Sequence, residues 1–229
     1  MNSRGCIVLF SGGLDSTTLL YYVLKGRKPE DVKALSVIYG QRHLREIECA
    51  KETCKKLGVE HQIVELHLEK LLDNSALIDH GKKLPEEHYT HESQKVTVVP
   101  GRNQMMISIA VAWADNIGAK KVYYAAHAND RAIYKDCRYP FVNALSRASR
   151  LGTDNEVEVV APFVNKYKSE LVKIGTELGV AFALTWSCYK GGKKACGLCG
   201  TCQERVEAFK KNGLKDPLPY EIEVDWSGK

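Results

Sequence analysis

A short glycine-containing loop places the strongest constraint on how this chain can fold. The hexapeptide 11–16, with the sequence SGGLDS, follows an apolar run at 6–10 and precedes apolar residues at helical spacing. The apolar run predicts a buried parallel strand, and the pattern after the loop predicts a helix that ends near Gly26. Glycines in such a turn let the backbone approach a ligand, and the first N–H groups of the helix point at an anion. The loop therefore predicts a phosphate site.

The residue types in the loop suit a nucleotide. Ser11 and Ser16 supply hydroxyl donors, and Asp15 is suited to hold the Mg²⁺ that accompanies ATP. A tight turn without a ligand is the plainer interpretation, but the strand and helix on either side favour a phosphate site. The loop resembles the SGGxDS loop of the N-type ATP pyrophosphatases, which cleave ATP between its α- and β-phosphates. The expected ATP-binding residues are Phe10, Ser11, Gly12, Gly13, Leu14, Asp15 and Ser16.

Strands and helices are predicted to alternate along most of the chain. Further strands are expected at 32–39, 60–66, 121–126 and 157–161, with helical patterns between them and after the last. This alternation predicts an α/β fold with a doubly wound parallel sheet. Ligands of such sheets bind outside the carboxyl ends of the strands. The phosphate loop and a polar cluster at 40–43 are both expected at that edge.

Two other segments are less regular. Residues 71–96 contain Gly81, Pro85 and a polar run at 86–92, which predict a long polar loop, either a lid or disordered. Lys168 is expected in the first turn of a helix, where the helix dipole disfavours a cation. A bound anion explains that position, and a surface lysine with a snorkelling side chain is the alternative.

Four cysteines close together predict a metal site near the C-terminus. Cys188, Cys196, Cys199 and Cys202 fall within fifteen residues of a glycine-rich stretch. Four thiolates surround one tetrahedral Zn²⁺ and leave no open position, so we predict one structural zinc per chain. An iron–sulfur cluster also takes four cysteines, and spacing alone leaves it open. We expect a nucleotide-binding domain at 1–184 and a zinc-binding segment at 185–229 packed on it.

Hydropathy and net charge bear on where the protein is found and on what it binds. No apolar run reaches the roughly 20 residues that a membrane helix needs, and no leader pattern is present, so we expect a cytoplasmic protein without a membrane partner. The net charge is +5, and residues 161–216 hold ten Lys and Arg against five Asp and Glu. Nucleic acid would suit this excess, but compensation of zinc-bound thiolates explains it as well, so we do not expect nucleic acid as a partner.

Several motifs taken together resemble one enzyme family. They are SGGLDS at 11–16, YGQRH at 39–43, VPGRN at 99–103, DCR at 136–138, and TWSCY at 185–189 with the following cysteines. The chain is similar along nearly its whole length to the 7-cyano-7-deazaguanine synthase (QueC) family of the ATP pyrophosphatases. The resemblance implies an adenine nucleotide alpha hydrolase-like fold and an ATP-dependent carbon–nitrogen ligase that releases AMP and pyrophosphate.

The resemblance also implies partners and a site. The substrates would be ATP, 7-carboxy-7-deazaguanine and ammonia, which give the nitrile through an adenylate and an amide, and the assembly would be a homodimer. Catalysis would involve Asp15, Ser16 and Lys168. The acceptor would be held by Tyr39, Gln41, Arg42, His43, Arg102, Asn103, Asp136 and Arg138.

Two alternatives stay open at this point. The family usually has Tyr-Pro before the Asp-Cys-Arg motif, whereas Tyr134 is followed by Lys135 in this chain. The sequence HAND at 127–130 also differs from the common bacterial version, and both positions are expected near the substrate pocket. An enzyme that passes the activated acid to another amine, for example on a protein, fits these differences. A tRNA-modifying ligase or sulfurtransferase of the same superfamily would share the phosphate loop and the zinc segment.

Overall fold

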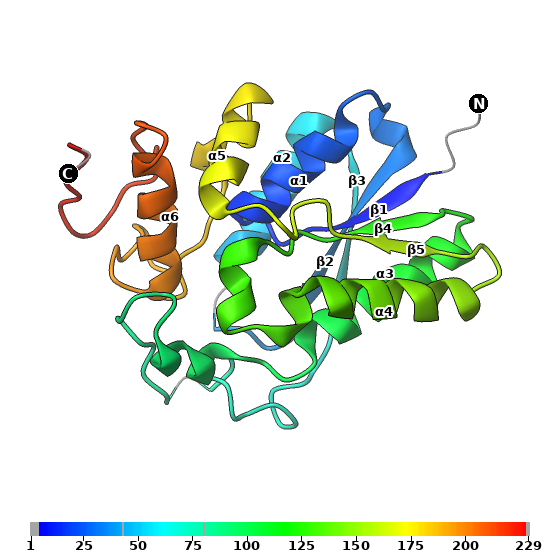
Figure 1. Ribbon diagram of the computed structural model, residues 1–229, viewed down its shortest axis with the longest axis horizontal. Helices are drawn as coiled ribbons and strands as arrows, with labels where there is room; N and C mark the ends of the chain where they lie inside the picture. The colour runs from blue at the N-terminus through cyan, green and yellow to red at the C-terminus, as the bar shows by residue number, and fades with distance from the viewer. Residues whose placement is uncertain (1–4, 43, 80, 228–229) are drawn as a thin grey trace.

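The computed structural model describes residues 5–42, 44–79 and 81–227, and its centre is a sheet of five parallel strands (Figure 1). The strands follow the order β3-β2-β1-β4-β5. Their bounds are Cys6–Leu9 for β1, Val32–Ile38 for β2, Glu60–Glu65 for β3, Lys121–Tyr123 for β4 and Glu158–Val160 for β5. The predicted doubly wound parallel sheet is confirmed.

Helices cover both faces of the sheet, as Figure 1 shows. The helices are α1 (Leu14–Leu24), α2 (Arg45–Leu57), α3 (Arg102–Asn116), α4 (Tyr139–Leu151), α5 (Lys168–Glu177) and α6 (Gly200–Lys210). Alternate residues of β1 point to opposite faces: Val8 packs in a core with α1, α2 and α5, whereas Ile7 packs in a core with α3 and α4. The near-continuous apolar character of β1 follows, since both of its faces are buried.

The strand order reverses between β1 and β4. From β1 the chain moves through α1 and α2 to β3 at one edge, and then crosses to β4 and β5 at the other. Such a reversal opens a crevice at the carboxyl ends of the two central strands. The loop 11–16 after β1 lies at this point.

Short 3₁₀ helices connect the main elements. They span Pro29–Asp31, Glu92–Thr97, Ala128–Ala132, Lys135–Cys137 and Phe182–Leu184. The segment expected as a polar loop at 71–96 contains no strand or α-helix among its described residues, but it is not merely solvated. Leu77 and Ile78 are buried in a small apolar cluster with Val99, against which Tyr39 and Tyr189 pack. The loop is therefore packed onto the edge of the sheet where the phosphate loop lies.

The C-terminal segment has two attachments. Ala208 and Phe209 of α6 belong to the same core as α1 and α5, and the four cysteines form a separate cluster with Trp186 and Leu218. Arg205 and Asp216 form a buried ion pair inside the segment, with Nε 2.6 Å from Oδ2. The division of the chain at residue 184 stays a prediction. Among the described residues, no helix combines the length and apolar character that crossing a membrane requires.

Candidate active site

The phosphate loop is held in shape by its own hydroxyl groups. The Ser16 hydroxyl accepts a hydrogen bond from the Ser11 N–H at 3.2 Å and shares another with the Ser11 hydroxyl at 3.0 Å. Gly12 has a φ of +85°, and a Cβ there would lie only 2.1 Å from the carbonyl oxygen of Glu46. A glycine is thus required at this position both by the backbone conformation and by the close approach of α2.

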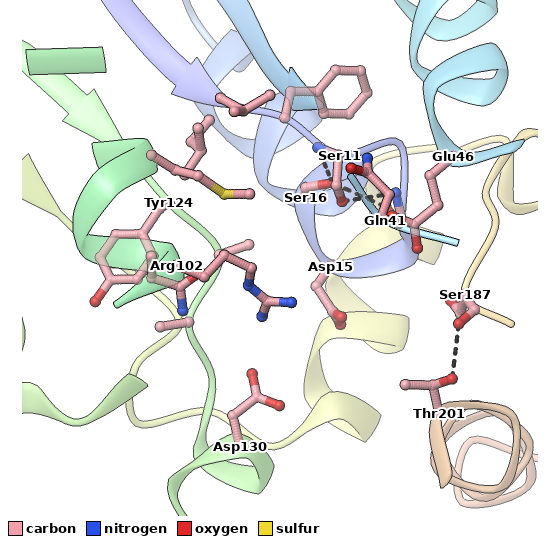
Figure 2. Close-up of a pocket in the computed structure, with 18 of the residues that line it drawn as sticks. Ser11, Asp15, Ser16, Gln41, Glu46, Arg102, Tyr124, Asp130, Ser187 and Thr201 are labelled. Carbon is pink, nitrogen blue, oxygen red and sulfur yellow. Dashed lines mark hydrogen bonds between the residues drawn. The ribbon is translucent and has the colours of Figure 1, made fainter. Parts of the chain in front are cut away.

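A cavity of about 270 Å³ opens at this edge of the sheet (Figure 2). It collects most of the expected site: Phe10, Ser11, Gly13, Asp15, Ser16, Tyr39, Gln41, Arg42, Arg102, Asn103 and Lys168 all line it. These residues come from the ends of β1 and β2, from α1, α3 and α5, and from the loop after β2. The fold therefore brings together in one cavity residues that are more than 150 positions apart in the sequence.

Four of the expected residues do not line the cavity, and His43 lies outside the described residues. The backbone of Gly12 packs on α2, and Leu14 is fully buried in the core. The Asp136 carbonyl accepts a hydrogen bond from the Tyr124 hydroxyl, and the exposed Arg138 donates through Nε to the Arg131 carbonyl. The structure therefore gives Asp136 and Arg138 no contact with the cavity, and neither enters the contacts proposed below.

Lys168 is at the centre of a buried charge network. Its Nζ lies 2.6 Å from Oε2 of Glu204 and 3.2 Å from Oδ2 of Asp15. His127 continues the network, since its Nε2 is 3.5 Å from Oδ2 of Asp15 and 3.3 Å from Oδ2 of Asp130. The cation at the start of α5 is thus explained in this structure by two carboxylates of the protein. The snorkelling alternative is wrong, because Lys168 is only 4 % exposed.

The network fixes the charge states of its members. Burial alone would raise the pKa of Asp15, but Lys168 and His127 outweigh burial and hold it well below its ordinary value. Burial would lower the pKa of His127, yet Asp130 and Asp15 raise it to about 9. Burial also opposes the charge of Lys168, whose pKa is nevertheless raised by Asp15 and Glu204. Asp15 is therefore an anion at neutral pH, and Lys168 and His127 are cations.

Aromatic hydroxyl groups and a guanidinium form another wall of the cavity. Arg102 lies over the ring of Tyr39, 5.8 Å from its centroid, and donates to the Tyr39 hydroxyl at 3.3 Å. The Tyr134 hydroxyl bonds to Thr97 at 2.7 Å and to the Tyr189 hydroxyl at 3.4 Å. Lys135, at the position where the resemblance leads one to expect proline, is exposed and does not line the cavity.

Cys137 lies at the edge of the cavity but is not activated. Burial raises the pKa of its thiol far above the ordinary value, and Asp130 and Asp136 raise it further. The Asn103 amide contacts its sulfur at 3.6 Å. Since the thiolate is the nucleophilic form, this thiol is unsuited to covalent catalysis.

Several cavity residues were not among the expected catalytic or binding residues, among them Glu46, His127, Asp130 and Glu204. A signal existed for His127 and Asp130, because both follow β4 near its carboxyl end, where ligands of such sheets bind. Glu46 is in the first turn of α2, directly after the polar cluster at 40–43. No sequence pattern indicates that Glu204 is a cavity residue, because only the packing of α6 against α5 places it there.

The four C-terminal cysteines form a possible metal site. Their sulfur atoms all lie within 4.8 Å of one another, all four residues are buried, and none is in a disulfide. Cys196 and Cys202 have sulfurs 3.9 Å apart, and tetrahedral Zn–S bonds of about 2.3 Å would separate sulfurs by about 3.8 Å. Backbone N–H groups of Leu198 and Cys199 point at the Cys196 sulfur, which suits a thiolate. The residues therefore fit one tetrahedral ion.

The cavity also offers oxygen atoms suited to a divalent cation. Oδ1 of Asp15 is buried and has no hydrogen-bond partner among the described residues. His127, Asp130 and Glu204 have ligand atoms within 4.8 Å of one another, beside Asp15. An unpartnered carboxylate oxygen next to the phosphate loop is the kind of ligand that Mg²⁺ prefers, so the carboxylates of this cluster fit a bound Mg²⁺.

Comparison with known proteins identifies the family. The model of the family described as "Queuosine biosynthesis protein QueC" matches residues 5–213. This chain belongs to that family. Within the QueC family, the chain is 50 % identical over 223 residues to the 7-cyano-7-deazaguanine synthase of Caldicellulosiruptor saccharolyticus, covering 97 % of this chain and 98 % of the relative. It is 46 % identical over 215 residues to that of Methanoregula boonei, covering 94 % and 98 %.

Membership confirms the family resemblance drawn from the motifs, and as a QueC family member the chain is an enzyme. A solved structure of NMN synthetase from Francisella tularensis is similar in fold, with a TM-score of 0.51 and 17 % identity over 93 % of this chain and 79 % of that one. At that identity the similarity shows the fold alone. It agrees with the parallel sheet described above.

Proposed function

We propose that this enzyme is an ATP-dependent ligase that converts 7-carboxy-7-deazaguanine and ammonia to 7-cyano-7-deazaguanine. The observation that carries the proposal is the shared cavity: the phosphate loop and the polar wall around Arg102 face the same space. Relatives that are named for this product cover nearly the whole chain. A site that activates an acid with ATP needs both binding surfaces within reach of each other.

The phosphate loop suits a departing pyrophosphate. Backbone N–H groups at the start of α1, with the hydroxyls of Ser11 and Ser16, surround the position of an anion. Lys168 adds a fixed buried cation next to the loop. Positive charge placed where negative charge develops lowers the barrier to cleavage of the α–β bond.

The remainder of the cavity has two chemically different parts. Apolar residues at the strand ends, with Met106, offer a surface for the adenine: Leu9, Phe10, Leu35 and Val37. Polar groups on the other side offer donors and acceptors for the deazapurine: Tyr39, Gln41, Arg42, Arg102, Asn103 and Tyr189. Arg102 is the cation placed to bind the carboxylate of the acid, since its guanidinium faces the cavity (Figure 2).

The residues then act by binding, orienting and excluding water. The acid carboxylate attacks the α-phosphate, which gives an acyl-adenylate and pyrophosphate; ammonia displaces AMP and gives the amide. The amide oxygen is adenylated by a second ATP, and loss of AMP and a proton leaves the nitrile. No side chain forms a covalent bond to substrate in this sequence, which agrees with the protonated state of Cys137. Leu77 of the segment 71–96 and Trp186, Ser187 and Tyr189 next to Cys188 line the cavity.

Two metals complete the proposal. Mg²⁺ held with ATP at Asp15 would supply charge neutralisation to the phosphates, and a single zinc would tie the four cysteines. The zinc site is closed, with four buried sulfurs and no open position, so its role is structural. The wall that carries Trp186, Ser187 and Tyr189 depends on it, because these residues lie beside Cys188.

Product analysis tests this proposal. The enzyme incubated with 7-carboxy-7-deazaguanine, ATP, Mg²⁺ and ammonia should yield a product of the nitrile's mass, with AMP and pyrophosphate. An adduct with another amine, formed while free ammonia gives no nitrile, would favour the alternative in which the activated acid is passed on. Lys135 is exposed and does not line the cavity, so this position gives that alternative no support, whereas His127 and Asp130 do line the cavity and the product analysis decides between the two.

A further inference from the structure

Glu46 is a carboxyl group in the cavity that the nucleotide chemistry does not use. It lies in the first turn of α2, and Figure 2 shows its side chain pointing into the cavity beside Gln41 and Ser187. In the same view, Arg102 and Tyr124 lie on the opposite side of Asp15. Glu46 therefore lies on the side of the cavity that carries Gln41 and Ser187, across Asp15 from Arg102 in this view.

The other carboxylates of the cavity each have a cationic partner in the protein. Asp15 and Glu204 pair with Lys168, and Asp130 pairs with His127. The side chain of Glu46 makes neither a hydrogen bond nor an ion pair with any residue that the structure describes. Burial raises the pKa of Glu46 to about 7, against the opposing effect of Arg102. Glu46 is only partly exposed to solvent, and a carboxyl group that lines a cavity without a protein partner gains from donors that a ligand supplies.

The ligands of this cavity differ in what they offer a carboxylate. The pyrimidine ring of a deazaguanine carries an N1–H next to an exocyclic 2-amino group, two parallel donors that match the two oxygens of one carboxylate. Adenine presents an acceptor at N1, which would face the carboxylate oxygens unfavourably. The 7-carboxyl group is on the opposite side of the deazaguanine, so an acid held by its pyrimidine edge at Glu46 points its carboxyl group away from Glu46, toward the interior of the cavity.

We propose that Glu46 selects the acceptor by reading its guanine-type edge, with its two oxygens accepting the ring N1–H and the 2-amino group. This inference rests on the proposed function and names the residue that sets its substrate class. Proteins that recognise an extruded base form hydrogen bonds to its Watson–Crick edge. A carboxylate is a suitable acceptor for the N–H donors on such an edge. The same pairing keeps the adenine of ATP out of the acceptor position, because a carboxylate that faces another hydrogen-bond acceptor is penalised.

Calorimetric titration with two ligands tests the inference. The probes are 7-carboxy-7-deazaguanine and its analogue without the 2-amino group, each titrated into the full-length zinc-loaded protein. The wild type should bind the analogue about 10- to 100-fold more weakly, the range expected for a charge-assisted hydrogen bond. Glu46→Gln should bind the natural acid more weakly by a similar factor and should discriminate less than about threefold between the two ligands. Its KM for ATP should stay at the wild-type value.

A matched control is available on the same helix. Glu48 is exposed and does not line the cavity, so Glu48→Gln should discriminate as the wild type does. If Glu46→Gln discriminates like the wild type, or if it changes only the KM for ATP or for ammonia, the inference about Glu46 is overturned and the proposed function stands. A wild type that binds ATP but neither deazapurine contradicts the proposed function itself.

The wild type alone supplies an independent readout, which also serves if Glu46→Gln does not fold. Donors on the ligand stabilise the carboxylate form of Glu46, whose pKa in the free protein is about 7. Binding of the acid at pH 7 should therefore release about half a proton, measured by calorimetry in buffers of different ionisation enthalpy. Proton uptake, or no proton exchange, would overturn the inference.

Discussion

The Nζ of Lys168 lies 2.6 Å from Oε2 of Glu204, and this contact joins α5, beside the phosphate loop, to α6, the helix that carries Cys202. Both side chains are buried, with 4 % and 5 % of each residue exposed. Lys168 also contacts Asp15 in the phosphate loop. The ion pair therefore couples the C-terminal segment to the site where ATP is expected to bind.

Glu204→Gln tests this coupling. Removing one charge of a buried pair leaves the other without compensation, so the free energy of unfolding should fall by about 3 kcal/mol. The measurement is urea denaturation of the zinc-loaded protein. Glu207→Gln is the control, because Glu207 is on the same helix but its contact with His88 is half-exposed. Loss of that contact should lower the free energy of unfolding by less than about 1 kcal/mol. Equal stabilities of the two variants would contradict a structural role for the buried pair.

Asp15→Asn should abolish pyrophosphate release. The variant loses the charge that faces Lys168 and His127 and the oxygen proposed for Mg²⁺, so a loss of at least about 100-fold is expected. Sequence reasoning predicts an intact fold, whereas the buried contacts predict a further loss of stability. A pyrophosphate assay with a parallel denaturation curve separates the two effects. Normal turnover would show that the phosphate loop is misassigned, and the exposed Asp154→Asn serves as the control.

The cysteine cluster should hold one zinc per chain. Cys199→Ser removes one of the four sulfurs, and the C-terminal segment should lose order because a structural zinc contributes on the order of 10 kcal/mol to a small element. Metal analysis of the purified protein and thermal denaturation of the variant are the measurements. A metal-free protein, a bound iron–sulfur chromophore, or a Cys199→Ser variant of unchanged stability would each count against the zinc assignment.

His127 should make stability depend on pH. Its pKa is raised in the folded protein from 6.5 to about 9 by Asp130 and Asp15, despite burial. A raised pKa means that its stabilising contribution is complete below about pH 6.5 and is lost as the pH rises to about 9. The unfolding free energy, measured without nucleotide or Mg²⁺, should therefore fall more steeply over this range in the wild type than in His127→Gln. Identical slopes would show that His127 is not charged in the folded state.

Local patterns were sufficient for much of the fold and for part of the site. The run 6–10 and the loop 11–16 form the predicted strand, turn and helix, because the apolar periodicity and the glycines act within a few residues. The four cysteines converge because short loops constrain their spacing. The phosphate loop and the polar residues after β2 meet because the carboxyl ends of parallel strands share one edge.

The rest depends on packing that no local pattern encodes. Glu204 reaches the cavity only because α6 packs on α5, and Lys168 meets it and Asp15 through that arrangement. Arg138 lies close in sequence to Cys137, which lines the cavity, yet it is exposed, because the backbone direction at the start of α4 decides where each side chain points. Residues 71–96 read as polar, but the few apolar residues Leu77 and Ile78 decide their packing.

The amide provides the most direct test of the proposed reaction. Two adenylations at one site require the amide to be a true intermediate that the cavity binds in the same pose as the acid. Supplied with 7-amido-7-deazaguanine and ATP but no ammonia, the enzyme should produce the nitrile and one AMP per product, measured by mass spectrometry and nucleotide chromatography. Starting from the acid with ammonia, it should consume two ATP per nitrile. If the enzyme adenylates the acid but never dehydrates the amide, it is not a nitrile synthase.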